Sequence, residues 1–166
     1  MKLSWGHRRN HPRTRRGRWL RWTAALVVAG LAACGGADYD TPASTLRTYQ
    51  DAIRAGNAPG GWACFSRGYQ AQTPGGYAEW QKDWSQRPAA ARDLEAGRRI
   101  ALEKVINQRV AFILLQTENL PPRPGGPFVY FVREAEGWKM TSHMDTTFHH
   151  ELEAAIARGE FRLPPP

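Results

Sequence analysis

Residues 110–117 read Val-Ala-Phe-Ile-Leu-Leu-Gln-Thr, and this stretch decides the class of fold. Its apolar run is continuous, so both faces of a strand formed here are apolar, which is typical of a central strand covered on both sides. Asn107-Gln108 supplies a turn before it. Three further strands are predicted around it, over residues 100–106, 128–134 and 138–142. The sequence therefore predicts an antiparallel sheet of about four strands.

Before the sheet, residues 41–57 carry the pattern of a capped helix. Thr41 can cap the first turn, and Pro42 suits the first helical position because no N–H is needed there. Gly56-Asn57 is a stop signal. Apolar residues recur between these ends at helical spacing, namely Leu46, Tyr49 and Ile53.

Further helical patterns lie on either side of the strands. Residues 62–66 predict a short apolar turn of helix, whereas residues 88–97 are Ala-rich and leave helix and loop both open. An aromatic stripe predicts a helix over residues 77–85, formed by Tyr77, Trp80 and Trp84. A C-terminal helix that stops at Gly159 is predicted by Phe148, Leu152, Ala155 and Ile156.

Together these patterns predict an α+β fold, with N-terminal helices packed on a curved antiparallel sheet and an added C-terminal helix. The expected organisation is a signal peptide at 1–33, a tether at 34–40, one domain at 41–162 and a Pro-rich tail at 163–166.

The first 34 residues resemble a bacterial lipoprotein signal peptide. A basic leader runs into a short apolar stretch that ends in the lipobox Leu31-Ala32-Ala33-Cys34. The resemblance implies export, cleavage before Cys34 and a lipid anchor on its sulfur, with outer-membrane sorting in a Gram-negative envelope because Gly35 follows. An ordinary secretory signal is the alternative. Residues 14–20 also resemble a twin-arginine motif, with Arg18 in place of the expected aromatic residue, so the export route stays open.

Cleavage before Cys34 changes the charge of the chain. The full sequence has 23 Lys and Arg against 15 Asp and Glu, a net charge of +8. Residues 1–33 hold eight of the basic residues and none of the acidic ones. Residues 34–166 therefore hold 15 basic and 15 acidic residues, and their net charge is zero. A neutral domain lacks the surplus positive charge that phosphate backbones require, and we expect no nucleic-acid partner.

Cys64 is the second of two cysteines in the chain. Lipidation consumes Cys34, so no intrachain disulfide is expected. The neighbours of Cys64 in the sequence Trp62-Ala63-Cys64-Phe65 are apolar, which predicts a buried and unreactive thiol.

Two short motifs resemble the nuclear-transport-factor-two-like superfamily. They are residues 44–59, a helix that ends in Ala-Gly-Asn, and residues 136–140, Glu-Gly-Trp-Lys-Met in the last hairpin. The resemblance implies a cone of one curved sheet wrapped over helices. Its members include isomerases, dehydratases, binding modules and envelope lipoproteins, so it does not specify an activity. The predicted C-terminal helix departs from the common pattern and could cover the mouth of the cone.

Two sets of residues are candidates for chemistry. His149 and Glu153 lie four residues apart near His143, Asp145, His150 and Glu151, a spacing that can hold a metal, but capping of the C-terminal helix by Asp145 or Thr146 is the favoured interpretation. Isomerase chemistry requires a buried carboxylate and an oxyanion donor, for which Asp51, Glu103 and Tyr130 are the candidates. The alternative for Glu103 is an ion pair with Arg99 or Lys104 on an exposed edge.

We therefore expect an anchored cell-envelope domain with no cofactor, no metal site and no assigned catalytic residue, which binds a small apolar ligand or an envelope protein. The alternatives are an isomerase or dehydratase and a structural protein that docks partners through residues 121–127 or 163–166. The candidates for a ligand pocket are Tyr49, Trp80, Trp84, Glu103, Tyr130 and Trp138.

Overall fold

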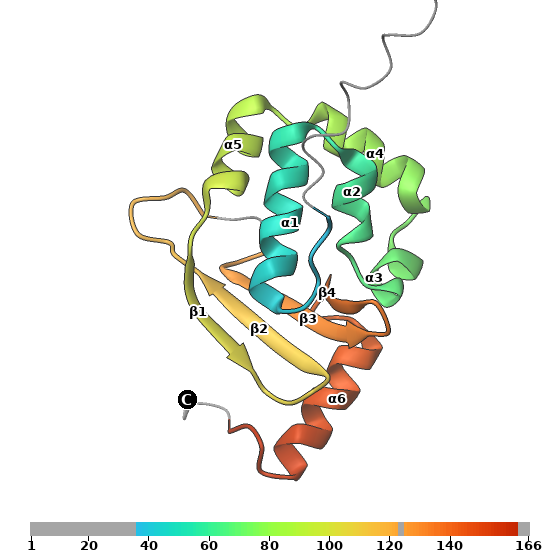
Figure 1. The fold of residues 1–166 in the computed structure, drawn as a ribbon, viewed down its shortest axis with the longest axis vertical. Helices are drawn as coiled ribbons and strands as arrows, with labels where there is room; N and C mark the ends of the chain where they lie inside the picture. Colours follow the sequence, from blue (N-terminus) through green and yellow to red (C-terminus); the bar gives the residue numbers. More distant parts are fainter. Residues whose placement is uncertain (1–35, 123–124, 163–166) are drawn as a thin grey trace, which may run out of the picture. The chain divides into compact units, whose positions relative to one another are not determined.

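The computed structural model describes residues 36–122 and 125–162 (Figure 1). The predicted signal peptide, Cys34 and the tail 163–166 lie outside the described residues, as do two residues of the loop 121–127. Within the described part of the chain, none of the helices has the length and apolar character needed to cross a membrane.

The four strands form one antiparallel sheet in the order in which they occur in the chain. They are β1 (Ile100–Val105), β2 (Val110–Leu115), β3 (Phe128–Glu134) and β4 (Gly137–Thr141). Asn107 shapes the first hairpin, since its Oδ1 accepts hydrogen bonds from the backbone N–H groups of Arg109 and Val110 at 2.8 and 3.0 Å. The predicted sheet of four strands is confirmed.

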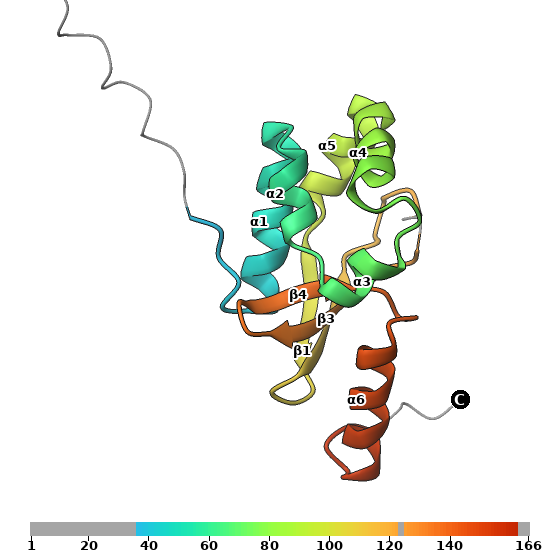
Figure 2. The same ribbon diagram turned by 90° about the vertical axis from the view of Figure 1, so that its right-hand side faces the viewer.

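Helices cover both faces of this sheet. Figure 2 shows the five N-terminal helices on one side and the C-terminal helix on the other. The N-terminal set is α1 (Pro42–Ala55), α2 (Ala58–Ala63), α3 (Arg67–Gln72), α4 (Gly76–Gln86) and α5 (Ala89–Gly97), and the C-terminal helix is α6 (Thr146–Ala157). The α+β class and the added C-terminal helix are confirmed.

Two of these helices differ from the prediction. The short helix expected at 62–66 lies at Ala58–Ala63 instead, because Asn57 caps it through a hydrogen bond from the backbone N–H of Gly60 (3.0 Å). Helix α3 was not predicted, and its six residues include none that is buried. The Ala-rich segment left open between helix and loop is helix α5.

The N-terminus of α1 is satisfied by both local and distant groups. Thr41 accepts a hydrogen bond from the N–H of Ser44, and Ser44 returns one to Thr41, both at 3.0 Å. The first turn contains no acidic residue, but Oε1 of Glu103 accepts from the N–H of Ala43 at 3.3 Å. The negative carboxylate of Glu103 therefore interacts favourably with the positive end of the dipole of α1. Glu103 lies on the exposed edge strand, as the alternative interpretation predicts, but among the described residues no ion pair joins it to Arg99 or Lys104.

The core on the inner face of the sheet is strongly aromatic. The ring centroid of Trp80 lies 4.8 Å from that of Trp84 and 5.2 Å from that of Trp62, and Tyr49 meets Trp84 at 5.9 Å. A Cβ at Gly61 would come within 2.7 Å of Trp84, so α2 can pack here only with glycine at that position. The predicted aromatic stripe thus packs against α1 and α2.

A second core lies on the outer face, against α6. Val110 and Val132 of the sheet pack with Phe148 and Ala155 of the helix, and all four are buried. The residues of β2 that alternate with Val110 face the inner core, which confirms that β2 is central and covered on both sides. Because α6 packs on this outer face, it does not cover the space between the sheet and the N-terminal helices.

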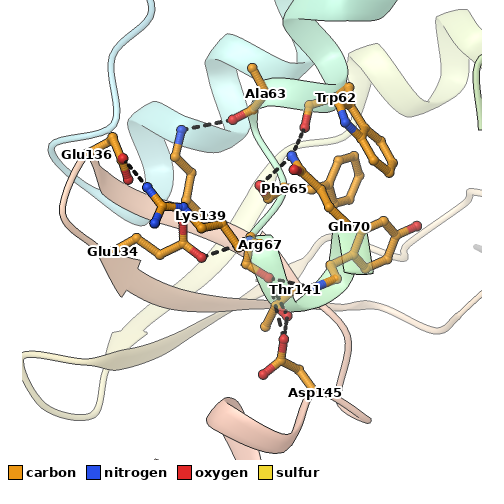
Figure 3. A network of polar contacts seen from close by, with 12 residues as sticks. Trp62, Ala63, Phe65, Arg67, Gln70, Glu134, Glu136, Lys139, Thr141 and Asp145 are labelled. Atoms are coloured by element: carbon orange, nitrogen blue, oxygen red, sulfur yellow. Dashed lines mark hydrogen bonds and ion pairs between the residues drawn. The ribbon is translucent and has the colours of Figure 1, made fainter. Parts of the chain in front are cut away.

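A buried polar chain joins α3, β4 and α6 (Figure 3). The hydroxyl of Ser66 donates to that of Thr141 at 3.0 Å, and the hydroxyl of Thr141 donates to Oδ2 of Asp145 at 2.8 Å. Asp145, which is 1% exposed, also accepts from the N–H of Phe148 at 3.0 Å and caps α6. Ser66 caps α3 in the same way, so Thr141 connects the caps of two helices.

We expect Thr141→Val to lower the free energy of unfolding by about 1–3 kcal/mol, because the buried groups of Ser66 and Asp145 then keep only their long mutual contact of 3.5 Å in place of the shared hydroxyl. Thr141→Ser keeps the hydroxyl and should cost only about 1 kcal/mol for the lost methyl group. Urea unfolding curves of the two variants measure the difference. Equal losses would mean that the methyl group, not the hydroxyl, stabilises this junction.

Candidate functional site

A cavity of about 460 Å³ lies between the N-terminal helices and one end of the sheet. It is lined by residues of α1, α3, α4 and α5, by the segment that precedes α3, and by β3 and the end of β4. Six of the lining residues are aromatic: Tyr49, Phe65, Tyr69, Trp80, Phe128 and Tyr130. This size and composition are typical of a site for a small organic molecule.

The cavity exists because β4 is shorter than β3. Tyr130 pairs with Thr141, the last residue of β4, so Phe128 and Val129 extend beyond the end of their neighbour. The chain then turns away through Ser142 toward α6. The start of β3 is consequently uncovered by β4 and contributes to the cavity wall.

The helical wall of the cavity is a continuous set of ring contacts centred on Phe65. Its ring stacks on Tyr69 with centroids 4.4 Å apart, and it meets Tyr49 and Trp80 edge-on at 5.5 and 5.9 Å. Each such contact contributes about 0.5–1.5 kcal/mol beyond the burial of area. The ring contacts of Phe65 with its neighbours therefore stabilise the shape of this wall.

The charged residues of the lining are Arg87 and Glu95, and His143 adds a polar ring. Glu95 is in an ion pair, with its Oε2 3.2 Å from Nε of Arg98, whose side chain is 2% exposed. Arg98 also donates to the carbonyl of Pro121 at 3.0 Å, and Gln50 donates to the carbonyl of Arg98 at 2.8 Å. Glu95 thus belongs to a network that closes one side of the site.

Of the six residues predicted for a ligand pocket, Tyr49, Trp80 and Tyr130 line the cavity. Trp84 lies behind Trp80 and Trp138 is buried under the guanidinium of Arg133, 5.9 Å from the ring centroid. Glu103 is exposed and lies outside the lining.

Several cavity residues are not predicted from the sequence, of which Phe65, Tyr69, Arg87 and Glu95 matter most. Phe65 is predicted as part of a short apolar helix and as a neighbour of Cys64, not as a pocket residue. The signal that could have identified it is its position in an aromatic cluster with Trp62 and Tyr69, at spacings of three and four residues. Arg87 precedes the Ala-rich segment 88–97 and Glu95 lies within it, and neither carries a comparable signal.

The residues considered for a metal site do not converge. Among the described residues, no group of three or more His, Cys, Asp or Glu side chains is placed to hold an ion. Glu151 pairs with Arg109 at 2.6 Å, and Asp145 is the cap of α6. Asp51, considered as a catalytic base, is exposed and pairs with Arg54 at 2.6 Å.

A second cluster lies where the segment 36–41 crosses β4. The carbonyl of Tyr39 accepts from the N–H of Trp138 at 2.8 Å, and the Nζ of Lys139 lies 3.3 Å from the ring centroid of Tyr39. The Sγ of Cys64, which lies beside Tyr39, donates to the carbonyl of Gly60 at 3.3 Å. Burial raises the pKa of Cys64 to about 11 and that of Tyr39 to about 12, and it lowers the pKa of Lys139.

Comparisons with protein-family models, with curated proteins and with solved structures each found no significant match for this chain. The arrangement of its own side chains therefore carries the functional argument.

We expect Cys64 to be unreactive toward a disulfide reagent such as Ellman's reagent at pH 8, where a pKa of about 11 leaves roughly one thiol in a thousand ionised. In a Cys34→Ser background Cys64 is the only thiol, so colour should develop only as urea unfolds the chain. The raised pKa favours folding below the ordinary thiol value, and this contribution should disappear as the pH rises through 11. Rapid labelling of the folded chain would contradict the buried position of Cys64.

Proposed function

We propose that this protein is a lipid-anchored domain of the bacterial cell envelope that binds a small, mainly apolar ligand. The observation that carries the proposal is the aromatic cavity of about 460 Å³ between the helices and the sheet. Ligand sites of about 300–1,000 Å³, lined by apolar and aromatic side chains with a few polar groups, are the usual form of such sites.

The chemistry of the lining favours binding over catalysis. Proton transfer in an isomerase requires a carboxylate that is free to accept a proton, but Glu95, the carboxylate in the lining, is engaged by Arg98. Asp51 is in an ion pair with Arg54, and Glu103 accepts a hydrogen bond from the first turn of α1. The resemblance of residues 44–59 and 136–140 to the nuclear-transport-factor-two-like superfamily supports a cone-shaped binding domain and is part of this proposal.

The proposed anchor fits the position of the segment 36–41. Tyr39 is fixed to β4 by its hydrogen bond with Trp138 and by its contact with Lys139. Cys34 precedes Tyr39 by five residues, a length of chain that spans at most roughly 18 Å. A lipid on Cys34 would keep the domain close to the membrane, where apolar compounds concentrate, and several acyl chains on one residue make a stable anchor.

Replacement of Ala91 tests the cavity, because Ala91 is exposed on α5 and lines it. We expect Ala91→Trp to fill the mouth and raise the dissociation constant of the neutral fluorescent probe N-phenyl-1-naphthylamine at least tenfold, or about 1.4 kcal/mol. The measurement uses the full chain with Cys34→Ser, so that no lipid competes for the probe.

The matched control is Ala90→Trp, which adds the same ring to the neighbouring exposed position outside the lining. It should leave probe binding within twofold. If wild type does not bind the probe, or if both variants bind as wild type does, the cavity is not a ligand site.

The anchor is tested by expressing the full chain in a bacterium with labelled palmitate. We expect the wild-type chain to incorporate label and sediment with membranes, and Cys34→Ser to do neither, because the thiol that accepts the lipid is gone. Cys64→Ala is the control and should behave as wild type, since Cys64 is buried in the domain. Membrane attachment of Cys34→Ser would show that the anchor is elsewhere.

A further inference from the structure

We propose that the ligand of this cavity is an anionic amphiphile, with an apolar body held against the aromatic wall and one carboxylate or sulfonate held by Arg87. This inference rests on the proposed ligand-binding function and adds to it the chemical class of the ligand.

Arg87 is a cation without a partner at the edge of an apolar site. It follows α4 directly, is half-buried and lines the cavity. Within the described part of the chain, its side chain makes no hydrogen bond, ion pair or ring contact. Partial burial of a charge without a partner is costly, and a planar guanidinium matches a carboxylate or sulfonate with two parallel hydrogen bonds.

Arg87 and Glu95 of the lining, taken together with Arg98 beside Glu95, carry one net positive charge. The negative charge of Glu95 is balanced by Arg98, which is itself buried and hydrogen-bonded to the carbonyl of Pro121. His143 lies with the residues that end the sheet, where its ring packs 6.0 Å from that of Tyr130. A ligand with one negative charge would neutralise the site, whereas a cationic ligand would be repelled by Arg87.

The position of Arg87 also defines the orientation of the ligand. Arg87 and Ala91 lie where α4 meets α5, whereas Tyr130 and His143 belong to the opposite, sheet end of the cavity. The lining also holds the rings of Tyr49, Phe65 and Trp80, and the ring of Tyr130 packs on Phe148 of α6 at 5.1 Å. An elongated or flat apolar body would therefore extend from Arg87 along the aromatic wall toward the sheet.

Two fluorescent probes separate the anionic group from the apolar body. 1-Anilinonaphthalene-8-sulfonate and N-phenyl-1-naphthylamine share one aromatic frame, and only the first carries a sulfonate. Both are titrated into the full chain with Cys34→Ser. The affinity is taken from the part of the binding that Ala91→Trp weakens, so that any sulfonate bound to the basic leader is not counted.

We expect Arg87→Leu to raise the dissociation constant of the sulfonate probe about tenfold and to change that of the neutral probe by less than twofold. Arg87→Lys keeps the charge without the planar fork and should give a loss of about threefold; it also provides the test if Arg87→Leu fails to fold. Arg47→Leu removes an exposed arginine of α1 that lies outside the lining, and should change neither affinity.

The outcomes distinguish this inference from the function on which it rests. If both probes bind in the cavity but the Arg87 variants weaken both equally or neither, the ligand is apolar without an anionic group, and the binding function stands. If neither probe binds in a manner sensitive to Ala91→Trp, the binding function itself fails, and the inference fails with it.

Discussion

The buried carboxylate of Asp145 is the constraint on which the arrangement of the domain depends. With 1% of its surface exposed, it must have its acceptors satisfied, and the donors come from Thr141 of β4 and from the first turn of α6. A Cβ at Gly68 would lie 2.1 Å from Oδ2 of Asp145, so α3 can approach this carboxylate only through a glycine. Three elements are thus fixed at one point, where β4 ends and the cavity begins.

The two cores stabilise the sheet without help from the cavity, and this allows the cavity to stay open. Alternate residues of β2 supply both cores, so the sheet is stabilised on both faces and does not need a filled space above the start of β3. The outer core holds α6 away from the helical side. The aromatic wall around Phe65 keeps its shape through ring contacts with its own neighbours, which allows a cavity to persist without a ligand.

Features that depend on local sequence could be predicted, and features that depend on distant contacts could not. The cap at Thr41, the stop at Gly56 and the double apolar character of β2 follow from residues close together in the chain. Helix α3 has no apolar periodicity, and it is fixed by Ser66 through partners some 75 residues away. The cavity depends on the relative length of two strands and on side chains from several elements, which no local pattern encodes.

The outer edge of β4 connects the proposed anchor to the cavity. An open edge strand exposes unpaired backbone groups, but here the N–H of Trp138 is bonded to Tyr39 and the N–H of Met140 to the carbonyl of Cys64, both at 2.8 Å. The carbonyl of Met140 in turn accepts from the N–H of Ser66 at 2.8 Å, so Phe65 lies between two fixed residues.

The segment 36–41, which leads to the proposed anchor, and the segment that carries Phe65 of the aromatic wall are therefore bonded to the same strand. The first of them brings Tyr39 onto Cys64 and Lys139, and the second brings Phe65 into the cavity. Because β4 joins them through backbone hydrogen bonds, the wall of the cavity has a fixed position relative to the point where the chain leaves toward Cys34. In the proposed function, binding of an amphiphile at a membrane surface would use this fixed relation between attachment and binding site, which the backbone hydrogen bonds of the short edge strand β4 provide.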